Sequence, residues 1–311
     1  MSLDFSKPLY FLAPLAGLTD LPFRSVVKKF GADVTVSEMI SSNALAYESK
    51  KTYKMLEKSP LENPYSIQIA GSDTKIIKRA VENINNQDGV DIIDLNCGCP
   101  VPKVVNNLQG SALLTDLKKM AKAIETIKKH SNKQYTSVKI RLGFTEKNHL
   151  EIAKICQDSG ADFIAVHGRT RAGKFKAPVD YDAIAEIKSI LKIPVVANGD
   201  IDSASKAKWV LNYTKCDGIM VGRGAVGRPW IFKEMKEGKE ILSKELISSV
   251  VLEHFEQMIK FYGEYGVVLF RKHLHTYSKY GYSGASKFRD SINRVTDVSQ
   301  ARDLIKNFFN S

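Results

Sequence analysis

Eight short runs of apolar and β-branched residues recur along most of the chain, and this repetition constrains the fold more than any other feature. Each run is continuous rather than alternating, as expected of parallel strands whose two faces are both covered. The runs are "YFLAPLA" from residue 10, "DVTVSEM" from 33, "YSIQIAG" from 65, "DIIDLN" from 91, "TSVKIRL" from 136, "DFIAVHG" from 162, "PVVANGD" from 194 and "DGIMVG" from 217.

Segments of helical periodicity separate the later runs, with apolar residues three and four positions apart. They cover residues 75–84, 117–128, 150–159, 181–191 and 203–211. A further helix is predicted at "TDLPFRS", where Thr19 or Asp20 can cap the start and Pro22 suits the first turn. Eight strand–helix units over about 235 residues favour an α/β TIM (β/α)8 barrel, which typically takes ~250 residues. A doubly wound open sheet is the competing fold, because the sequence does not show whether the sheet closes.

The pattern changes near Gly238, after which the chain has no strand run and only helical periodicity. We therefore expect a barrel domain over residues 1–240, followed by a small C-terminal all-helical bundle over residues 241–311. Within the bundle, the stretch 271–294 is rich in Lys and Arg, carries Asp290 as its single acidic residue and interleaves the cations with His, Tyr and Phe. Such a surface suits an RNA backbone and unstacked bases. The alternative is a solvated basic surface whose aromatic residues pack inward.

Composition narrows the class of protein. The 46 Lys and Arg exceed the 34 Asp and Glu, and the net charge of +12 suggests a polyanionic partner such as nucleic acid. The apolar run 9–18 is interrupted by Pro14 and Gly17, so it is too short to cross a membrane, and it lacks the basic front end of a signal peptide. The 4 cysteines are too few for a disulfide framework. We expect a cytoplasmic, monomeric protein without membrane association.

Polar residues occur inside or at the ends of several runs. In a TIM barrel, catalytic groups lie at the C-terminal ends of the strands. Because polar side chains are costly to bury unpaired, a polar ligand in the barrel mouth would explain several of them at once. Alternatively, each is satisfied by its neighbours. The residues are Gln68, Asn96, Lys139, Arg141, His167, Asn198 and Asp200.

The stretch "GRGAVG", residues 222–227, matches the dinucleotide pattern G-x-G-x-x-G. It lies in the last barrel unit, however, and no further strand follows it to carry a ribose-binding acid. As the turn after the eighth strand, it forms with "NGD" at 198–200 the usual phosphate site of this fold, where Arg223 adds charge. The alternative is that the glycines only permit a tight turn.

Cys97 and Cys99 flank one glycine after the fourth run. A structural zinc site needs four ligands, and Cys156 and Cys216 are isolated, so we expect no metal. A redox pair is more natural as Cys-x-x-Cys, which leaves one working thiol in the loop. Free thiols are mostly protonated at neutral pH and can act as general acids. The alternative is that both cysteines are small, half-buried hydrophobic residues.

Taken as an ordered set, the motifs resemble the tRNA-dihydrouridine synthase family. They run through the whole barrel, and the sequences "SEMISSN" and "HGRTR" are most similar to those of the bacterial B-type branch. The motifs are "APLAGLTDLPFR" at 13–24, "SEMISS" at 37–42, "QIAGSD" at 68–73, "DLNCGCPVPKV" at 94–104, "GSALL" at 110–114, "KIRLG" at 139–143, "HGRTR" at 167–171, "ANGDI" at 197–201 and "GRGAVGRPWIF" at 222–232.

The resemblance implies an FMN enzyme that reduces a uridine in the D-loop of tRNA to 5,6-dihydrouridine, with NADPH or NADH as the electron donor. Hydride would pass from flavin N5 to uracil C6, and a proton would pass from a thiol to C5. The helical tail would bind tRNA. The B-type likeness implies position 17 of tRNA.

Residue roles also follow from the resemblance. For the cofactor, the implied contacts with the isoalloxazine are Pro14, Leu15, Ala16, Gln68, Lys139 and His167. The implied contacts with the ribityl phosphate end are Asn198, Gly199, Asp200, Gly222 and Arg223. The thiol of "GCP" selects Cys99 as the proton donor, Asn96 would orient the uracil, and Glu38 and Arg271 would contact tRNA.

Two other functions are compatible with parts of the sequence. An FMN barrel acting on a free pyrimidine, such as a dihydroorotate-type dehydrogenase, would share the barrel motifs but would not need the basic tail. A non-catalytic tRNA-binding protein that has kept the barrel would need the tail but not Cys99. Activity on free pyrimidines, or full function of Cys99→Ala, would favour these alternatives.

Overall fold

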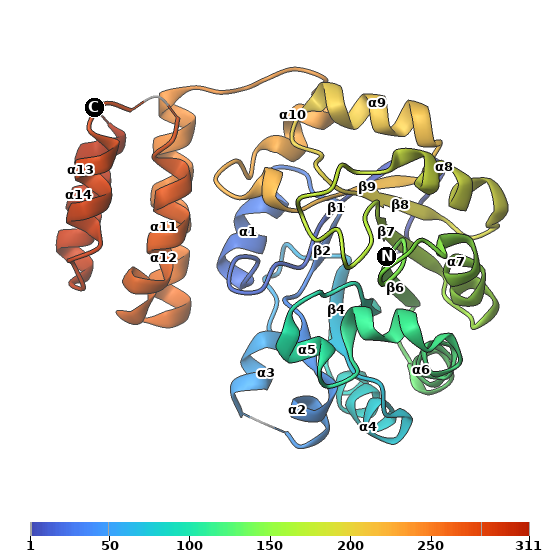
Figure 1. Ribbon diagram of the computed structural model, residues 1–311. Helices are drawn as coiled ribbons and strands as arrows, with labels where there is room; N and C mark the ends of the chain where they lie inside the picture. Colours follow the sequence, from blue (N-terminus) through green and yellow to red (C-terminus); the bar gives the residue numbers. More distant parts are fainter. Residues whose placement is uncertain (1, 49, 281, 311) are drawn as a thin grey trace.

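The strands of the computed structural model, which describes residues 2–48, 50–280 and 282–310, form a closed parallel barrel (Figure 1). Hydrogen-bonded neighbours follow the order β2-β1-β9-β8-β7-β6-β5-β4, and pairing of β2 with β4 closes the ring. The closure confirms the predicted TIM barrel and excludes an open sheet. The strands are β1 Leu9–Leu12, β2 Val34–Val36, β4 Tyr65–Ala70, β5 Ile92–Cys97, β6 Tyr135–Arg141, β7 Phe163–His167, β8 Val195–Asn198 and β9 Gly218–Val221, with the short β3 Ile40–Ser41 paired to β4.

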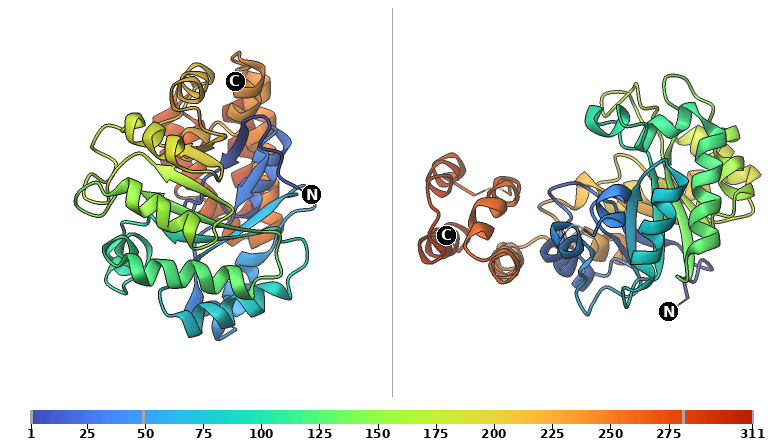
Figure 2. Two further views of the ribbon diagram at one scale, coloured as in Figure 1. Left: turned by 90° about the vertical axis from the view of Figure 1, so that its right-hand side faces the viewer. Right: turned by 90° about the horizontal axis from the view of Figure 1, so that it is seen from below.

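Helices surround the barrel at the predicted places (Figure 2). The start of α1 matches the expectation, because Asp20 Oδ1 accepts a hydrogen bond from the Phe23 N–H at 3.2 Å and Pro22 lies in the first turn. The helices of the barrel are α1 Leu21–Lys29, α2 Ser42–Ala46, α3 Lys50–Leu56, α4 Thr74–Asn85, α5 Pro102–Val105, α6 Leu117–His130, α7 His149–Asp158, α8 Tyr181–Ile190, α9 Ala204–Thr214 and α10 Ile231–Glu237, with 3-10 turns η1 Gly110–Thr115 and η2 Arg223–Ala225.

The last four helices pack together beside the barrel, as Figures 1 and 2 show. They are α11 Lys244–Tyr262, α12 Tyr265–Tyr277, α13 Ala285–Ile292 and α14 Val298–Phe309. Tyr277, Tyr282 and Phe288 are buried inside this bundle, so most of the rings in the basic stretch pack inward rather than facing solvent. Within the described ranges, no helix is both long enough and apolar enough to cross a lipid bilayer.

The bundle shares a buried interface with the barrel. The ring of Phe23 in α1 lies 5.4 Å from His254 of α11 and 5.3 Å from His273 of α12, measured between ring centroids. Trp230, which precedes α10, packs with Val26 of α1 in the apolar cluster of the bundle and stacks on Tyr277. The bundle therefore buries the side chains of α1, and of Trp230 just before α10, that face away from the barrel.

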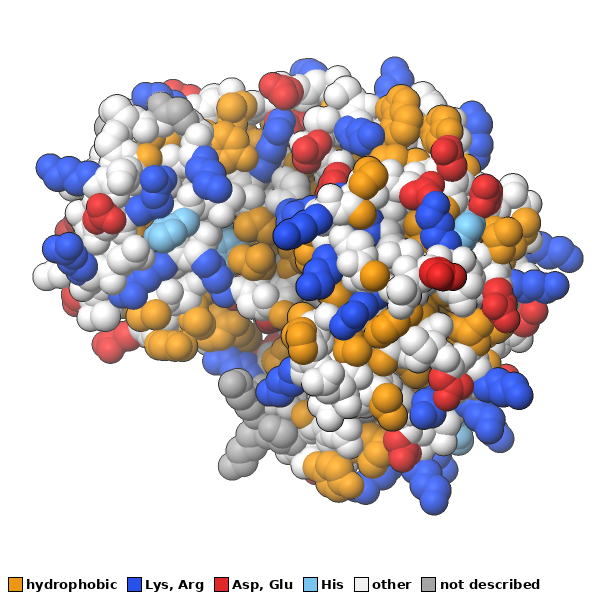
Figure 3. All heavy atoms as spheres, viewed as in Figure 1, with side chains coloured by type: hydrophobic (Ala, Val, Ile, Leu, Met, Phe, Trp, Pro, Cys, Tyr) orange, Lys and Arg blue, Asp and Glu red, His pale blue; other side chains and the backbone are white. Residues whose placement is uncertain are grey.

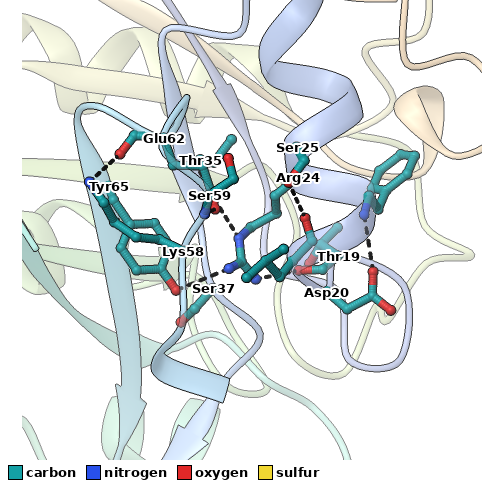
Figure 4. A network of polar contacts seen from close by, with 12 residues as sticks. Thr19, Asp20, Arg24, Ser25, Thr35, Ser37, Lys58, Ser59, Glu62 and Tyr65 are labelled. Atoms are coloured by element: carbon teal, nitrogen blue, oxygen red, sulfur yellow. Dashed lines mark hydrogen bonds and ion pairs between the residues drawn. The ribbon is translucent and has the colours of Figure 1, made fainter. Parts of the chain in front are cut away.

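A buried ion pair fixes α1 to the strands next to it (Figure 4). The Glu62 carboxylate, with no exposed surface, accepts hydrogen bonds from Arg24 Nε at 2.6 Å, Thr35 Oγ1 at 2.7 Å and the Ser59 N–H at 2.8 Å. Arg24 also donates to the Tyr65 hydroxyl at 3.2 Å. Three groups thus surround one carboxylate, which satisfies a charge that would otherwise be costly to bury. The network holds α1, β2 and β4 together below the β1–α1 loop.

Candidate active site

A cavity of about 500 Å³ opens at the C-terminal ends of the strands. This is the end of a TIM barrel where reactive groups are expected. The cavity brings together residues of β4, β5, β6, β7, β8 and β9, and of loops at the C-terminal ends of the strands, including the loop after β1. Its lining includes Pro14, Leu15, Ala16, Gln68, Asn96, Cys99, Lys139, His167, Asn198, Gly199, Asp200, Gly222 and Arg223.

Cys99 is held in the cavity wall by its backbone. The Asn96 side-chain oxygen accepts hydrogen bonds from the N–H groups of Gly98 at 3.1 Å and Cys99 at 2.9 Å. On the other side, the Cys99 carbonyl accepts from the Ser111 hydroxyl at 2.8 Å. These anchors leave the Cys99 side chain partly exposed toward the cavity.

Cationic groups converge on the same cavity. Burial and the neighbouring Arg141 lower the pKa of Lys139 to about 8, and burial with Arg169 lowers that of Arg141 to about 10. Burial and four surrounding cations lower the pKa of His167 to about 2, so its imidazole is neutral. Because Arg169 Nη1 can only donate to His167 Nε2, 3.3 Å away, the ring proton resides on Nδ1. The site is therefore rich in positive charge that a bound anion would offset.

The loops after β8 and β9 each place a glycine, Gly199 and Gly222, in the cavity lining. Gly199 has a φ of +132°, and a Cβ there would lie 2.9 Å from Val179 Cγ2 and 3.3 Å from His167 Cδ2. Gly222 precedes the turn η2, and a Cβ there would lie 3.6 Å from Ala13 Cβ. Between the loops, the Asp200 carboxylate accepts from Arg223 Nη2 at 2.7 Å and from Arg169. The loops after β8 and β9 thus meet at one end of the cavity through the Asp200–Arg223 ion pair.

Two of the predicted site residues lie outside the cavity lining. Glu38 accepts a hydrogen bond from the Gly17 N–H in the β1–α1 loop, beside the mouth. Arg271 donates to the Val295 carbonyl at 2.9 Å, so part of its guanidinium is engaged within the bundle. Its neighbour Lys272 approaches the mouth instead, since a Cβ at Gly17 would lie 3.6 Å from Lys272 Nζ. The rotation of α12 about its axis decides which of the two cations faces the barrel.

The sequence as a whole matches the model of the family described as dihydrouridine synthase over residues 11–311. The chain belongs to the dihydrouridine synthase family. It is 52% identical over 310 residues to a probable tRNA-dihydrouridine synthase of Helicobacter pylori, covering 99% of this chain and 94% of that protein. It is 39% identical over 307 residues to tRNA-dihydrouridine synthase B of Pseudomonas aeruginosa, covering 96% and 92%. The name of the Pseudomonas aeruginosa relative agrees with the resemblance to the B-type branch.

Solved structures support the fold of this dihydrouridine synthase family member. Histamine dehydrogenase from Rhizobium sp. 4-9 superimposes with a TM-score of 0.57 and 11% sequence identity, covering 80% of this chain and 48% of that one. At this identity, the likeness concerns the barrel architecture alone.

The structure adds two residues to the site that sequence reasoning missed. Arg169, which is 4% exposed, connects Asp200 to His167, and Phe175 lines the cavity between the guanidinium groups of Arg141 and Arg223. The "HGRTR" motif contains Arg169 and could have suggested it, whereas Phe175 lies in an irregular loop without a pattern. Among the described residues, no group of three or more His, Cys, Asp or Glu side chains could hold a metal ion.

Proposed function

We propose that the protein is a tRNA-dihydrouridine synthase that reduces one uridine of tRNA to 5,6-dihydrouridine. Its cofactor is FMN, and NADPH or NADH is the electron donor. The observation that carries this proposal is that the Cys99 thiol lines the same cavity as Lys139, His167 and the loops after β8 and β9. Family membership and the tRNA-directed names of the relatives support the same substrate. A tRNA substrate implies a cytoplasmic protein.

The residues present fit a flavin mononucleotide. Its phosphate and reduced ring carry negative charge, which the cations around the cavity would stabilise. Burial is the main cause of the lowered pKa values of Lys139 and His167, and neighbouring cations add to it; a bound anion would offset that positive charge. We assign Pro14, Leu15, Ala16, Gln68, Lys139 and His167 to the ring, and Asn198, Gly199, Asp200, Gly222 and Arg223 to the phosphate end.

When bound, FMN supplies the hydride that adds to uracil C6. The developing negative charge on C5 and the C4 carbonyl then needs a proton and a positive field. Cys99 donates the proton to C5, a contribution typically of ~10² to 10⁴ in rate for general acid catalysis. Lys139, which is half-buried in the cavity wall and cationic below its pKa of about 8, stabilises negative charge in the cavity. Asn96 Nδ2 donates one hydrogen to Gln68 Oε1, and its second hydrogen is the one that orients the uracil.

The bundle, residues 241–311, is the part we assign to tRNA binding, and residues 1–240 form the catalytic domain. Figure 3 shows Lys and Arg side chains spread over the bundle and the middle of the barrel face. Lys279, Lys287 and Arg294 are exposed on the bundle and can contact phosphates. Glu38 and Arg271 are proposed as further contacts near the mouth. Because the target base lies within folded tRNA, it must be turned out of its stack to enter the cavity.

The test incubates unmodified tRNA with purified protein, FMN and NADPH, and measures dihydrouridine by mass spectrometry of the nucleosides. The proposal predicts dihydrouridine in tRNA, at position 17, and none from free uridine. Reaction with free uracil or dihydroorotate in the absence of tRNA would instead support a free-pyrimidine enzyme. Protein that binds tRNA but no flavin would support a non-catalytic binder.

A further inference from the structure

A continuous chain of hydrogen bonds runs across three neighbouring strands of the barrel, beside the cavity. Ser137 Oγ of β6 donates to Asp94 Oδ1 at 2.6 Å, and Gln68 Nε2 of β4 donates to Asp94 Oδ2 at 2.7 Å. Asn96 Nδ2 then donates to Gln68 Oε1 at 2.6 Å. Since Asp94 and Asn96 both belong to β5, three adjacent strands hold the chain in place.

The far end of this chain is the loop that carries Cys99. Asn96 Oδ1 accepts from the backbone N–H groups of Gly98 and Cys99, which can only donate. The Asn96 nitrogen must therefore face Gln68, and the Gln68 oxygen must face Asn96. With its oxygen facing Asn96, Gln68 turns its nitrogen toward Asp94, and the Asp94 carboxylate accepts the hydrogen bond from that nitrogen. A reversed Gln68 amide would set two donors against each other, so each amide keeps one orientation and one free N–H.

An ionisable side chain at position 94 lowers the stability of the fold, so stability alone does not explain why Asp94 is there. It is 4% exposed and lines a small inner cavity of about 10 Å³ with apolar residues such as Phe11 and Phe163. Burial raises its pKa to about 6, so ionisation of the carboxyl lowers the stability of the fold as the pH rises from its ordinary pKa of 3.8 to about 6, and that loss persists at higher pH. A role in the site accounts for its presence better than a contribution to folding.

We propose that Asp94 is a positioning residue for the reaction: through Gln68 and Asn96 it fixes the amide groups that face the cavity and holds the backbone of the Cys99 loop. The catalytic consequence rests on the proposed function. The coupling between Asp94 and Cys99 is a property of the fold and can be measured without catalysis.

The first test measures alkylation of Cys99 by iodoacetamide in the folded protein, with and without FMN. Asp94→Ala removes the acceptor, whereas the oxygen of Asp94→Asn can still accept from Gln68 while its nitrogen donates to Ser137. We expect Asp94→Ala to accelerate Cys99 labelling about threefold or more, because local opening of the loop becomes easier. Asp94→Asn should restore the wild-type rate. Cys97, resolved by peptide fragmentation, is buried and reports any general opening of the core.

A second variant covers the case in which Asp94→Ala does not fold. Gln68→Met breaks the chain in the middle while Asp94 stays in place, and it should accelerate Cys99 labelling to a similar extent. Wild-type labelling rates of Cys99 in Gln68→Met, or in a folded Asp94→Ala, would overturn the proposal. The same holds if Cys97 labelling rises in parallel with that of Cys99.

The kinetic test uses pre-reduced protein and saturating tRNA in a single turnover. Asp94→Ala should slow dihydrouridine formation about tenfold, since small displacements of a reacting group have effects of this size or larger. Asp94→Asn should stay near wild type, and each rate is expressed per bound flavin because Gln68 is assigned to the flavin ring. An unaltered rate in Asp94→Ala contradicts the positioning role. If wild-type protein forms no dihydrouridine, the proposed function fails, while the labelling experiment still decides the coupling.

Discussion

Cys97 and Cys99 lie two residues apart but occupy different environments: Cys97 is fully buried in the barrel core, whereas Cys99 is partly exposed and lines the cavity. Burial raises the pKa of the Cys97 thiol well above its usual value, and nearby Cys156 adds to the shift. A thiol without solvent access is inert toward most reagents. The structure therefore assigns Cys97 a packing role, which the sequence alone left open.

This difference predicts opposite effects for two matched substitutions. Cys99→Ala removes the proposed proton donor and should slow dihydrouridine formation by about 10² or more, with little change in stability. Cys97→Ala leaves the donor intact but creates a small cavity, and should cost about 1 kcal/mol of unfolding free energy. Single-turnover rates and urea denaturation measure the two effects. Equal activity of the two variants would contradict the role of Cys99.

The local features of the fold could be predicted from the sequence. Continuous apolar runs predicted the barrel strands, and Thr19 or Asp20 together with Pro22 predicted the start of α1, where the structure has Asp20 as the cap. The polar residues at the ends of the runs lie together because parallel strands of a barrel end at the same rim. These patterns depend on neighbouring residues in the chain, so one sequence is enough to recognise them.

Features that depend on how elements pack could not be predicted. The pairing of β1 with β9 joins residues far apart in the chain, such as Leu9 and Gly218, and β3 is only two residues long. The rotation of α12 turns Lys272, rather than Arg271, toward the barrel mouth. Inward packing of Tyr277 likewise depends on the neighbouring helices. Composition and spacing carry no information on these contacts.

The buried carboxylate of Glu62 predicts a large stability effect. Glu62→Ala leaves the Arg24 guanidinium buried without its charge partner and should lower the unfolding free energy by about 3 kcal/mol. Glu57→Ala is the control, because Glu57 is exposed in the same segment and should change stability by less than ~0.5 kcal/mol. Chemical denaturation followed by circular dichroism compares them. Similar stabilities would show that the ion pair does not hold α1.

Contact between the bundle and the loop after β9 can be tested at Gly227. This glycine has a φ of +79°, and a Cβ there would lie 2.4 Å from Thr276 Cγ2 of α12. Gly227→Ala should therefore destabilise the protein by about 3 kcal/mol through strain and a clash. Gly238→Ala is matched in backbone conformation, with a φ of +71°, but has no atom within 4 Å of the added Cβ. It should cost about 1 kcal/mol. Equal losses of unfolding free energy in the two variants would mean that α12 does not contact the loop closely at Gly227.

The lowered pKa of Lys139 predicts how FMN affinity depends on pH. Lys139 carries its charge below a pKa of about 8 and loses it as the pH rises through that value. A bound anion raises this pKa, so binding takes up a proton above about pH 8, and affinity should fall by up to about tenfold per pH unit there. Fluorescence titration of the apoprotein between pH 7 and pH 9 measures the change.

The control for this titration is a second lysine. Lys139→Gln should bind FMN more weakly at pH 7 and show a flatter pH dependence, because the titrating group is gone. The exposed Lys192 should be replaceable by Gln without either effect. A wild-type pH dependence in Lys139→Gln would assign the titration to another group.

The most direct test of the proposed function maps dihydrouridine in the tRNA of a strain that lacks this protein. We predict that dihydrouridine disappears from one D-loop position, expected to be 17, and that the wild-type gene restores it whereas Cys99→Ala does not. Unchanged dihydrouridine at every position after deletion, with no compensating enzyme in the strain, would contradict the assignment.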